Sequence, residues 1–154
     1  TFLHPHTPYS KIREYIYIGT NECCQKKEFI KELLKEGIEA DISLEEIRID
    51  APFGVKYYLW LPVKDHTAPT LLQFKIGVAM INQLVKAKKK VYIHCEKGHG
   101  RAPTLVAAYL MTQEMGLKEA IDFLKSKRPG VYIRPKQMKA LKNFKGQLKK
   151  FKIK

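Results

Sequence analysis

The sequence predicts an α/β domain built on a central, mostly parallel sheet of four or five strands flanked by helices. Two observations lead to this prediction. Short segments rich in β-branched and aromatic residues alternate with longer segments whose apolar residues recur every three or four positions. Such alternation is typical of parallel strands joined by helices. In addition, the apolar run at residues 91–94 leads through a glycine-containing loop into an apolar helix, a position where α/β sheets bind ligands.

The predicted strands are short and largely apolar. The first, IREYIYI, ends at Gly19, and the third, KYYLWLPV, follows a turn predicted at residues 50–54. The last, VYIH, is expected to be buried. The four predicted strands are residues 12–18, 38–44, 56–63 and 91–94.

The predicted helices have recognisable ends. Asn21 is a candidate cap for the first helix and Gly37 its stop, while Gly116 ends the helix expected at the centre. Three lysines at residues 88–90 follow the second helix, at the negative end of its dipole. The five predicted helices are residues 21–37, 70–87, 101–115, 117–127 and a basic helix at about 136–150.

Length and cysteine count limit the class of protein. The 154 residues suffice for one core, so residues 1–154 are predicted to form a single domain. No apolar run reaches about 18 residues, and the first ten residues lack the pattern of a signal peptide, so neither a span nor a leader is expected. Cys23, Cys24 and Cys95 form a poor disulfide framework and suit a reducing, cytoplasmic setting. The first two are expected to be packing residues, and no cysteine or histidine spacing predicts a metal.

The net charge of +14 is concentrated at the end of the chain. Beyond Asp122 there are twelve Lys or Arg residues and no Asp or Glu. The preceding part has 17 basic and 15 acidic residues, a net charge of +2. The basic segment is either a solvated lysine surface or a patch for nucleic acid, anionic lipid or an acidic protein.

The segment HCEKGHGR, residues 94–101, has the composition of a phosphate-binding loop. Backbone N–H groups in a tight loop and at a helix N-terminus can surround a phosphate, and Gly98 and Gly100 allow the close approach. Arg101 adds a planar guanidinium that can bind two phosphate oxygens. The same donors favour a thiolate at Cys95, which would lie under the phosphorus and attack it.

Together with its strand–loop–helix setting, this segment resembles the signature of the protein tyrosine phosphatase superfamily: His, Cys, five residues, then Arg. SKIREYIYIGT, YLWLPVKDHTAP and RPGVYIRPKQMKAL resemble segments of its dual-specificity branch, so the resemblance extends from about Ser10 to Phe144. The resemblance implies that Cys95 is the nucleophile, that Arg101 clamps the phosphoryl group, and that Asp65 is the general acid and base. Asp65 also follows a strand that could lie beside residues 91–94, which would bring it to the same edge.

Further residues receive predicted roles. Asp50 and Glu96 are weaker candidates for the acid. Residues of the loop itself are predicted to bind the substrate: Glu96, Lys97, Gly98, His99, Gly100 and Arg101. The resemblance implies supporting roles for His94, which orients the loop, and Gln137, which matches a water-positioning glutamine.

One departure from the family pattern concerns turnover. The family usually has Ser or Thr directly after the Arg, and this chain has Ala102, with the hydroxyl of Thr104 two positions later. Phosphoenzyme hydrolysis is therefore predicted to be slow, or Thr104 to substitute in part.

The predicted function is hydrolysis of phosphate monoesters through a phosphocysteine intermediate, with phosphotyrosine and also phosphoserine and phosphothreonine as substrates. Three alternatives remain: the same chemistry on a phosphoinositide, an inositol polyphosphate or an RNA 5′-phosphate; a phosphate-binding, nearly inactive phosphatase; and a sulfurtransferase. The expected partner is a phosphorylated protein or a small phosphate ester, with contact to an anionic polymer or lipid through the basic segment. A monomer without metal or organic cofactor is expected.

Overall fold

The computed structural model describes residues 8–48 and 54–148, and its centre is a five-stranded sheet of order β1-β2-β5-β3-β4. The β1–β2 pair is antiparallel, and β2, β5, β3 and β4 are mutually parallel. This confirms the predicted mostly parallel sheet. The strands are β1 (Tyr9–Arg13), β2 (Ile16–Gly19), β3 (Ile38–Ser43), β4 (Tyr57–Trp60) and β5 (Lys90–His94).

The predicted strand at residues 12–18 is wrong as a single strand. A tight turn at residues 14 and 15 divides it into the end of β1 and the beginning of β2, and the register shifts between Lys11 and Arg13. Neither turn residue is a Gly, Pro, Asn or Asp, so the sequence carries no local signal for this hairpin. The predicted turn at residues 50–54 falls mostly outside the described residues, as does Asp50.

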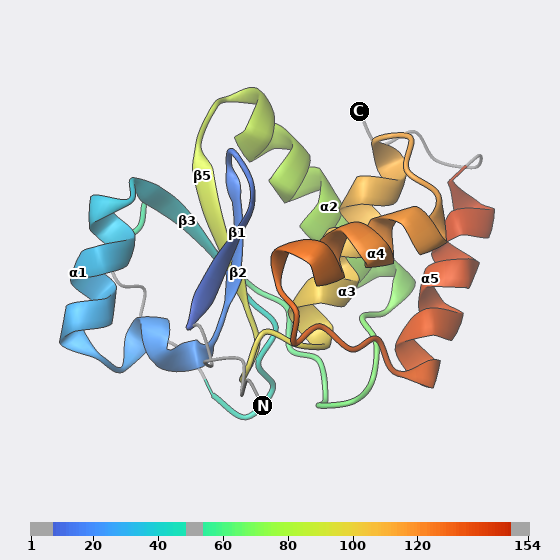
Figure 1. Cartoon of the computed structure of the whole chain (residues 1–154), viewed down its shortest axis with the longest axis horizontal. Coiled ribbons are helices and arrows are strands. Elements are labelled where there is room, and N and C mark those ends of the chain that lie inside the picture. Colours follow the sequence, from blue (N-terminus) through green and yellow to red (C-terminus); the bar gives the residue numbers. More distant parts are fainter. Residues whose placement is uncertain (1–7, 49–53, 149–154) are drawn as a thin grey trace.

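Helices cover both faces of the sheet (Figure 1). The predicted first helix is divided into a short 3₁₀ helix and α1, which lie on one side, whereas α2 to α5 lie on the other. No helix among the described residues is both long enough and apolar enough to cross a bilayer. The helices are η1 (Asn21–Cys24), α1 (Lys27–Lys35), α2 (Leu71–Lys86), α3 (Arg101–Thr112), α4 (Leu117–Lys127) and α5 (Pro135–Gln147).

Helix α3 lies at the centre of the larger core. Every residue from Arg101 to Met111 is buried, because α3 packs against the sheet and against α2, α4 and α5. Three alanines and a valine among the 12 residues of this helix allow neighbouring elements to approach closely. Strand β5 is buried along residues 91–94, in the middle of the sheet. The loop between β5 and α3 is therefore held between two buried elements of the fold.

Candidate active site

The phosphate loop, residues 95–100, connects the carboxyl end of β5 to the N-terminus of α3. Gly98 has a φ of 72°, a conformation that side chains disfavour, and a Cβ there would lie only 2.6 Å from the carbonyl oxygen of Gly19. The backbone N–H of Asn21 donates to the carbonyl of Glu96 at 3.1 Å. The loop is thus pressed against the end of β2 and the start of η1, and only glycine suits position 98.

A pocket of about 250 Å³ opens over the phosphate loop. Cys95 is only 3% exposed and belongs to the main hydrophobic core, and it also lines this pocket. Three segments far apart in the sequence form the walls. The lining residues are Asp65, His66, Cys95, Glu96, Lys97, His99, Gly100, Arg101, Gly130, Tyr132, Arg134 and Gln137.

Arg101 is held in place by backbone carbonyls behind the pocket. Its Nη1 donates to the carbonyl of Val63 at 2.8 Å and to that of Leu44 at 3.3 Å, and the residue is 5% exposed. Its Nε lies 3.5 Å from Oδ1 of Asp65. The guanidinium is therefore oriented by the ends of β3 and β4 before any anion binds, which lowers the cost of ordering it.

Asp65 lies on the acid loop, residues 64–69, and reaches the pocket despite a strand order that differs from the expected one. We expected the strand before it to lie beside residues 91–94, but β3 separates β4 from β5. The chain continues past β4 and crosses this gap, with Val63 N–H donating to Leu44 O at 3.2 Å. The Asp65 side chain is 59% exposed, and its Oδ1 accepts a hydrogen bond from the His66 N–H at 2.9 Å.

The other predicted residues occupy different layers around the loop. Glu96 and Lys97 are exposed at the rim, and His99 is half-buried. Thr104 is buried, and its hydroxyl donates to the carbonyl of Gly100 at 2.7 Å. Gln137 is buried at the beginning of α5 and lines the pocket.

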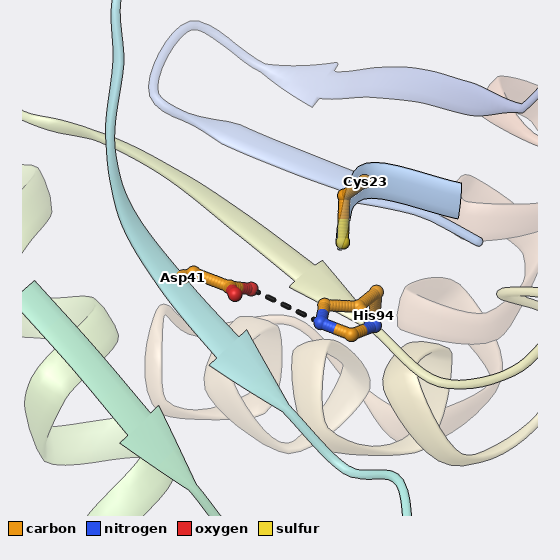
Figure 2. A group of neighbouring side chains, drawn as sticks. All are labelled: Cys23, Asp41 and His94. Carbon is orange, nitrogen blue, oxygen red and sulfur yellow. Dashed lines mark ion pairs between the residues drawn. The ribbon is translucent and has the colours of Figure 1, made fainter. Parts of the chain in front are cut away.

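His94 belongs to a fully buried polar cluster behind the loop (Figure 2). Its Nε2 lies 3.2 Å from Oδ1 of Asp41 on β3, and Cys23 from η1 completes the group. Burial raises the pKa of Tyr92 well above its ordinary value, and the charges of Cys23 and Asp41 act in the same direction. Because a buried polar group left without its partner is costly, loss of either Asp41 or His94 alone destabilises the fold through the residue left behind.

The same cluster brings together three residue types that bind zinc. One ligand atom each from Cys23, Asp41 and His94 lies within 4.8 Å of the others. Sequence spacing did not reveal this group because its members come from three separate elements. A structural zinc site has four ligands, and the cluster supplies three.

Arg128 is a loop-supporting residue that the sequence prediction missed. Its Nε donates to the carbonyl of Gly98 at 2.9 Å, its Nη2 to that of Lys97 at 2.8 Å, and its Nη1 to Oγ of Ser10 at 2.9 Å. Burial lowers the pKa of Arg128, whereas the charges of Tyr92 and Cys95 raise it. With the loop carbonyls directed at Arg128, the guanidinium adds positive charge beside Cys95.

A family comparison decides what kind of domain this is. The model of the dual specificity phosphatase catalytic domain matches residues 16–147, which include the whole phosphate loop. The chain belongs to this phosphatase family. Membership confirms the resemblance read from the signature segment and gives no support to the sulfurtransferase alternative.

Individual relatives of this phosphatase domain act on different substrates. It is 34% identical over 120 residues to "Dual specificity protein phosphatase 5" of Homo sapiens, covering 77% of this chain and 30% of that protein. It is 27% identical over 144 residues to "Phosphatidylglycerophosphate phosphatase PTPMT2" of Arabidopsis thaliana, covering 88% of this chain and 62% of that one. The chain therefore spans less than two thirds of the length of either relative.

A solved structure has the same fold across nearly the whole chain. The crystal structure of PTPMT1 in complex with PI(5)P superimposes with a TM-score of 0.82 and 27% sequence identity, covering 93% of this chain and 97% of that one. The relatives thus include both protein and lipid phosphatases.

Proposed function

We propose that this domain hydrolyses phosphate monoesters through a phosphocysteine intermediate on Cys95. The observation that carries the proposal is a single pocket lined by Cys95, Arg101 and Asp65. The three residues come from the phosphate loop, the first turn of α3 and the acid loop, and each supplies a different function to one phosphoryl group. Family membership supports the reaction class.

The reaction has two balanced steps. The Cys95 thiolate attacks phosphorus, an S–P bond forms, the ester P–O bond breaks, and Asp65 gives its proton to the leaving oxygen. Water then attacks the phosphocysteine, Asp65 accepts its proton, and inorganic phosphate leaves as the thiolate is regenerated. The Arg101 guanidinium and the loop N–H groups stabilise the charge on the phosphoryl oxygens in both steps.

We propose phosphotyrosine as a substrate, with phosphoserine and phosphothreonine as further ones. Support comes from the family, which is that of dual specificity phosphatases, and from the similarity to the human protein phosphatase. In the pocket wall, the exposed ring of Tyr132 offers an apolar surface to a substrate side chain.

A rate profile against pH on a small aryl phosphate tests the proposal. Cys95→Ser should have no detectable activity, because its hydroxyl is a far weaker nucleophile. Asp65→Asn should lose roughly 100-fold in kcat and lack the basic limb of the profile, because nothing then protonates the leaving oxygen. Asp122→Asn, an exposed change on α4, is the matched control and should equal wild type. Wild-type activity in Asp65→Asn would remove Asp65 from the mechanism.

A second candidate substrate is a phospholipid or inositol phosphate, and the charge around the pocket favours it. Lys97, His99 and Arg134 line the same pocket as Cys95, so a substrate with further negative charge would meet basic groups beside the phosphate site. Similarity to a protein named phosphatidylglycerophosphate phosphatase and to PTPMT1, whose structure was solved in complex with PI(5)P, supports this candidate.

Relative turnover distinguishes the two candidates. A phosphotyrosine peptide and phosphatidylglycerophosphate in vesicles are compared for wild type, Lys97→Gln and Arg134→Gln. If the lipid is the substrate, both variants should lose several-fold more kcat/KM on phosphatidylglycerophosphate than on the phosphotyrosine peptide. Equal losses on both would favour the phosphoprotein.

A further inference from the structure

Gln137 lies on one of the three segments that form the pocket and is next to the other two. It is the third residue of α5, is 1% exposed, and lines the pocket. A Cβ at Gly100 would lie 3.2 Å from its Nε2, so its amide also lies against the phosphate loop. A buried amide at this junction has to be satisfied by specific partners.

Both ends of the Gln137 amide are hydrogen-bonded. Its Oε1 accepts from the backbone N–H of Arg134 at 2.9 Å, in the manner of a helix N-terminal capping box, and its Nε2 donates to the carbonyl of Thr67 at 3.0 Å. The partners fix the orientation, because the opposite orientation would place oxygen against a carbonyl and NH₂ against an N–H. The cap therefore directs the NH₂ group at the acid loop.

The part of the acid loop that precedes Asp65 is already bonded to the sheet, whereas the part that follows Asp65 is held by the Gln137 hydrogen bond. Before Asp65, Val63 is bonded to the end of β3 through its N–H, and Arg101 donates to its carbonyl. After Asp65, the N–H and hydroxyl of Thr67 both donate to the carbonyl of Lys64, which closes a tight turn around Asp65. The Gln137 bond connects this turn to α5.

We propose that Gln137 is a positioning residue that holds the acid loop, and with it Asp65, over the phosphate loop. The inference rests on the proposed role of Asp65 as general acid. It differs from the water-positioning role implied by the family resemblance, because the Gln137 NH₂ group donates a hydrogen bond to the carbonyl of Thr67 on the acid loop. Loss of this bond lowers the efficiency of proton transfer to the leaving oxygen, while the nucleophile and the phosphate site stay intact.

The two roles predict different dependence on the leaving group. Proton donation matters most for a poor leaving group, so a displaced acid slows phenyl phosphate more than p-nitrophenyl phosphate. Phosphocysteine hydrolysis is the same step for every substrate, so a lost water position affects both esters equally. The value of kcat/KM isolates the first step, since it covers events up to release of the alcohol.

Gln137→Glu is the sharpest variant. It keeps the shape of the side chain and the acceptor for Arg134, but turns an oxygen toward the Thr67 carbonyl. The carboxylate that Gln137→Glu adds to the pocket wall lowers phosphate binding for both esters alike, so the ratio of the two losses is decisive. We expect the loss of kcat/KM on phenyl phosphate to exceed the loss on p-nitrophenyl phosphate by about threefold or more, a part of the full effect of a general acid. Gln137→Met, which retains volume without a donor, gives the same comparison if the Glu variant does not fold.

Gln73 provides a matched control. It is the third residue of α2, its Oε1 accepts from the Thr70 N–H at 3.0 Å, and its Nε2 donates to the carbonyl of Pro62 at 2.9 Å. Gln73→Glu therefore makes the same chemical change at a helix cap, on the side of the loop that the sheet already holds. Any loss of kcat/KM in Gln73→Glu should be the same for phenyl phosphate and p-nitrophenyl phosphate.

The outcomes separate the inference from the proposed function. If Asp65→Asn discriminates between the two esters and neither Gln137 variant does, the positioning role is overturned and the function stands. If Asp65→Asn does not discriminate, the general acid assignment fails and the role of Gln137 fails with it. A larger loss on phenyl phosphate in both Asp65→Asn and the Gln137 variants, with Gln73→Glu indifferent, supports the inference.

Discussion

The hydroxyl groups after Arg101 differ from the family pattern in a way that bears on turnover. Ala102 has no hydroxyl, and the single hydroxyl hydrogen of Thr104 is donated to the carbonyl of Gly100. Thr104 therefore cannot donate that hydrogen to the Cys95 sulfur at the same time. In the proposed mechanism, the departing Cys95 thiolate would therefore lack a hydroxyl donor from either position.

We predict that wild-type enzyme gives a burst of about one alcohol per active site, followed by slow turnover. Ala102→Ser should raise steady-state kcat about tenfold, because a hydrogen bond to a charged group contributes about 1.5–3 kcal/mol. Rapid-quench measurement on p-nitrophenyl phosphate checks both. Thr104→Val is the control and should keep the burst. Loss of turnover in Thr104→Val, with no change in Ala102→Ser, would show that Thr104 supplies the hydrogen.

At the scale of elements, the end of α4 supports the phosphate loop. Arg128 follows the helix directly, is 2% exposed, and bonds two consecutive loop carbonyls. A carbonyl fixed on the outside of a loop turns the next N–H toward the inside. The end of α4 therefore orients peptide groups of the phosphate loop.

We expect Arg128→Ala to weaken inhibition by inorganic phosphate about tenfold or more, because two loop carbonyls lose their charged donor. Arg128→Lys should not restore the affinity, since one ammonium does not reproduce the planar guanidinium. Lys127→Ala, an exposed neighbour, is the control. The measurement is the inhibition constant for inorganic phosphate, taken for all variants at one ionic strength. An unchanged constant in Arg128→Ala would contradict the supporting role of Arg128.

At the scale of the whole molecule, positive charge is gathered on one helix. Lys136, Lys139, Lys142 and Lys145 are exposed on α5, which has no acidic residue, and α5 begins at the pocket. Helix α1 also carries exposed lysines, but Glu28 and Glu32 accompany them. The charge on α5 is therefore the stronger attraction for an anionic surface.

Replacing the four α5 lysines by Gln should lower binding to vesicles containing anionic lipid by at least about tenfold at low salt, at about 1 kcal/mol per lysine near the surface. The kcat/KM on p-nitrophenyl phosphate should stay within about twofold, because none of the four lines the pocket. Lys27, Lys31 and Lys35 on α1, changed together to Gln, are the control. Vesicle sedimentation measures the binding, and equal losses in both variants would indicate nonspecific attraction.

The sequence by itself determined most of the elements and the place of one loop between a strand and a helix. Helix and strand periodicity depend on neighbours within a few residues, so the alternation, the mostly parallel sheet and the loop from Cys95 to Arg101 were predicted correctly. Prediction from the sequence failed where no local signal exists, as in the hairpin turn at residues 14 and 15.

Only the tertiary structure decided which distant residues meet. The strand order placed β3 beside β5, which brings Asp41 to His94 and Cys23, and the return of the chain after α4 placed Arg128 and Gln137 against the loop. These contacts join residues separated by dozens of positions. Their partners are set by strand register and helix packing, which depend on the whole core and not on any short stretch of sequence.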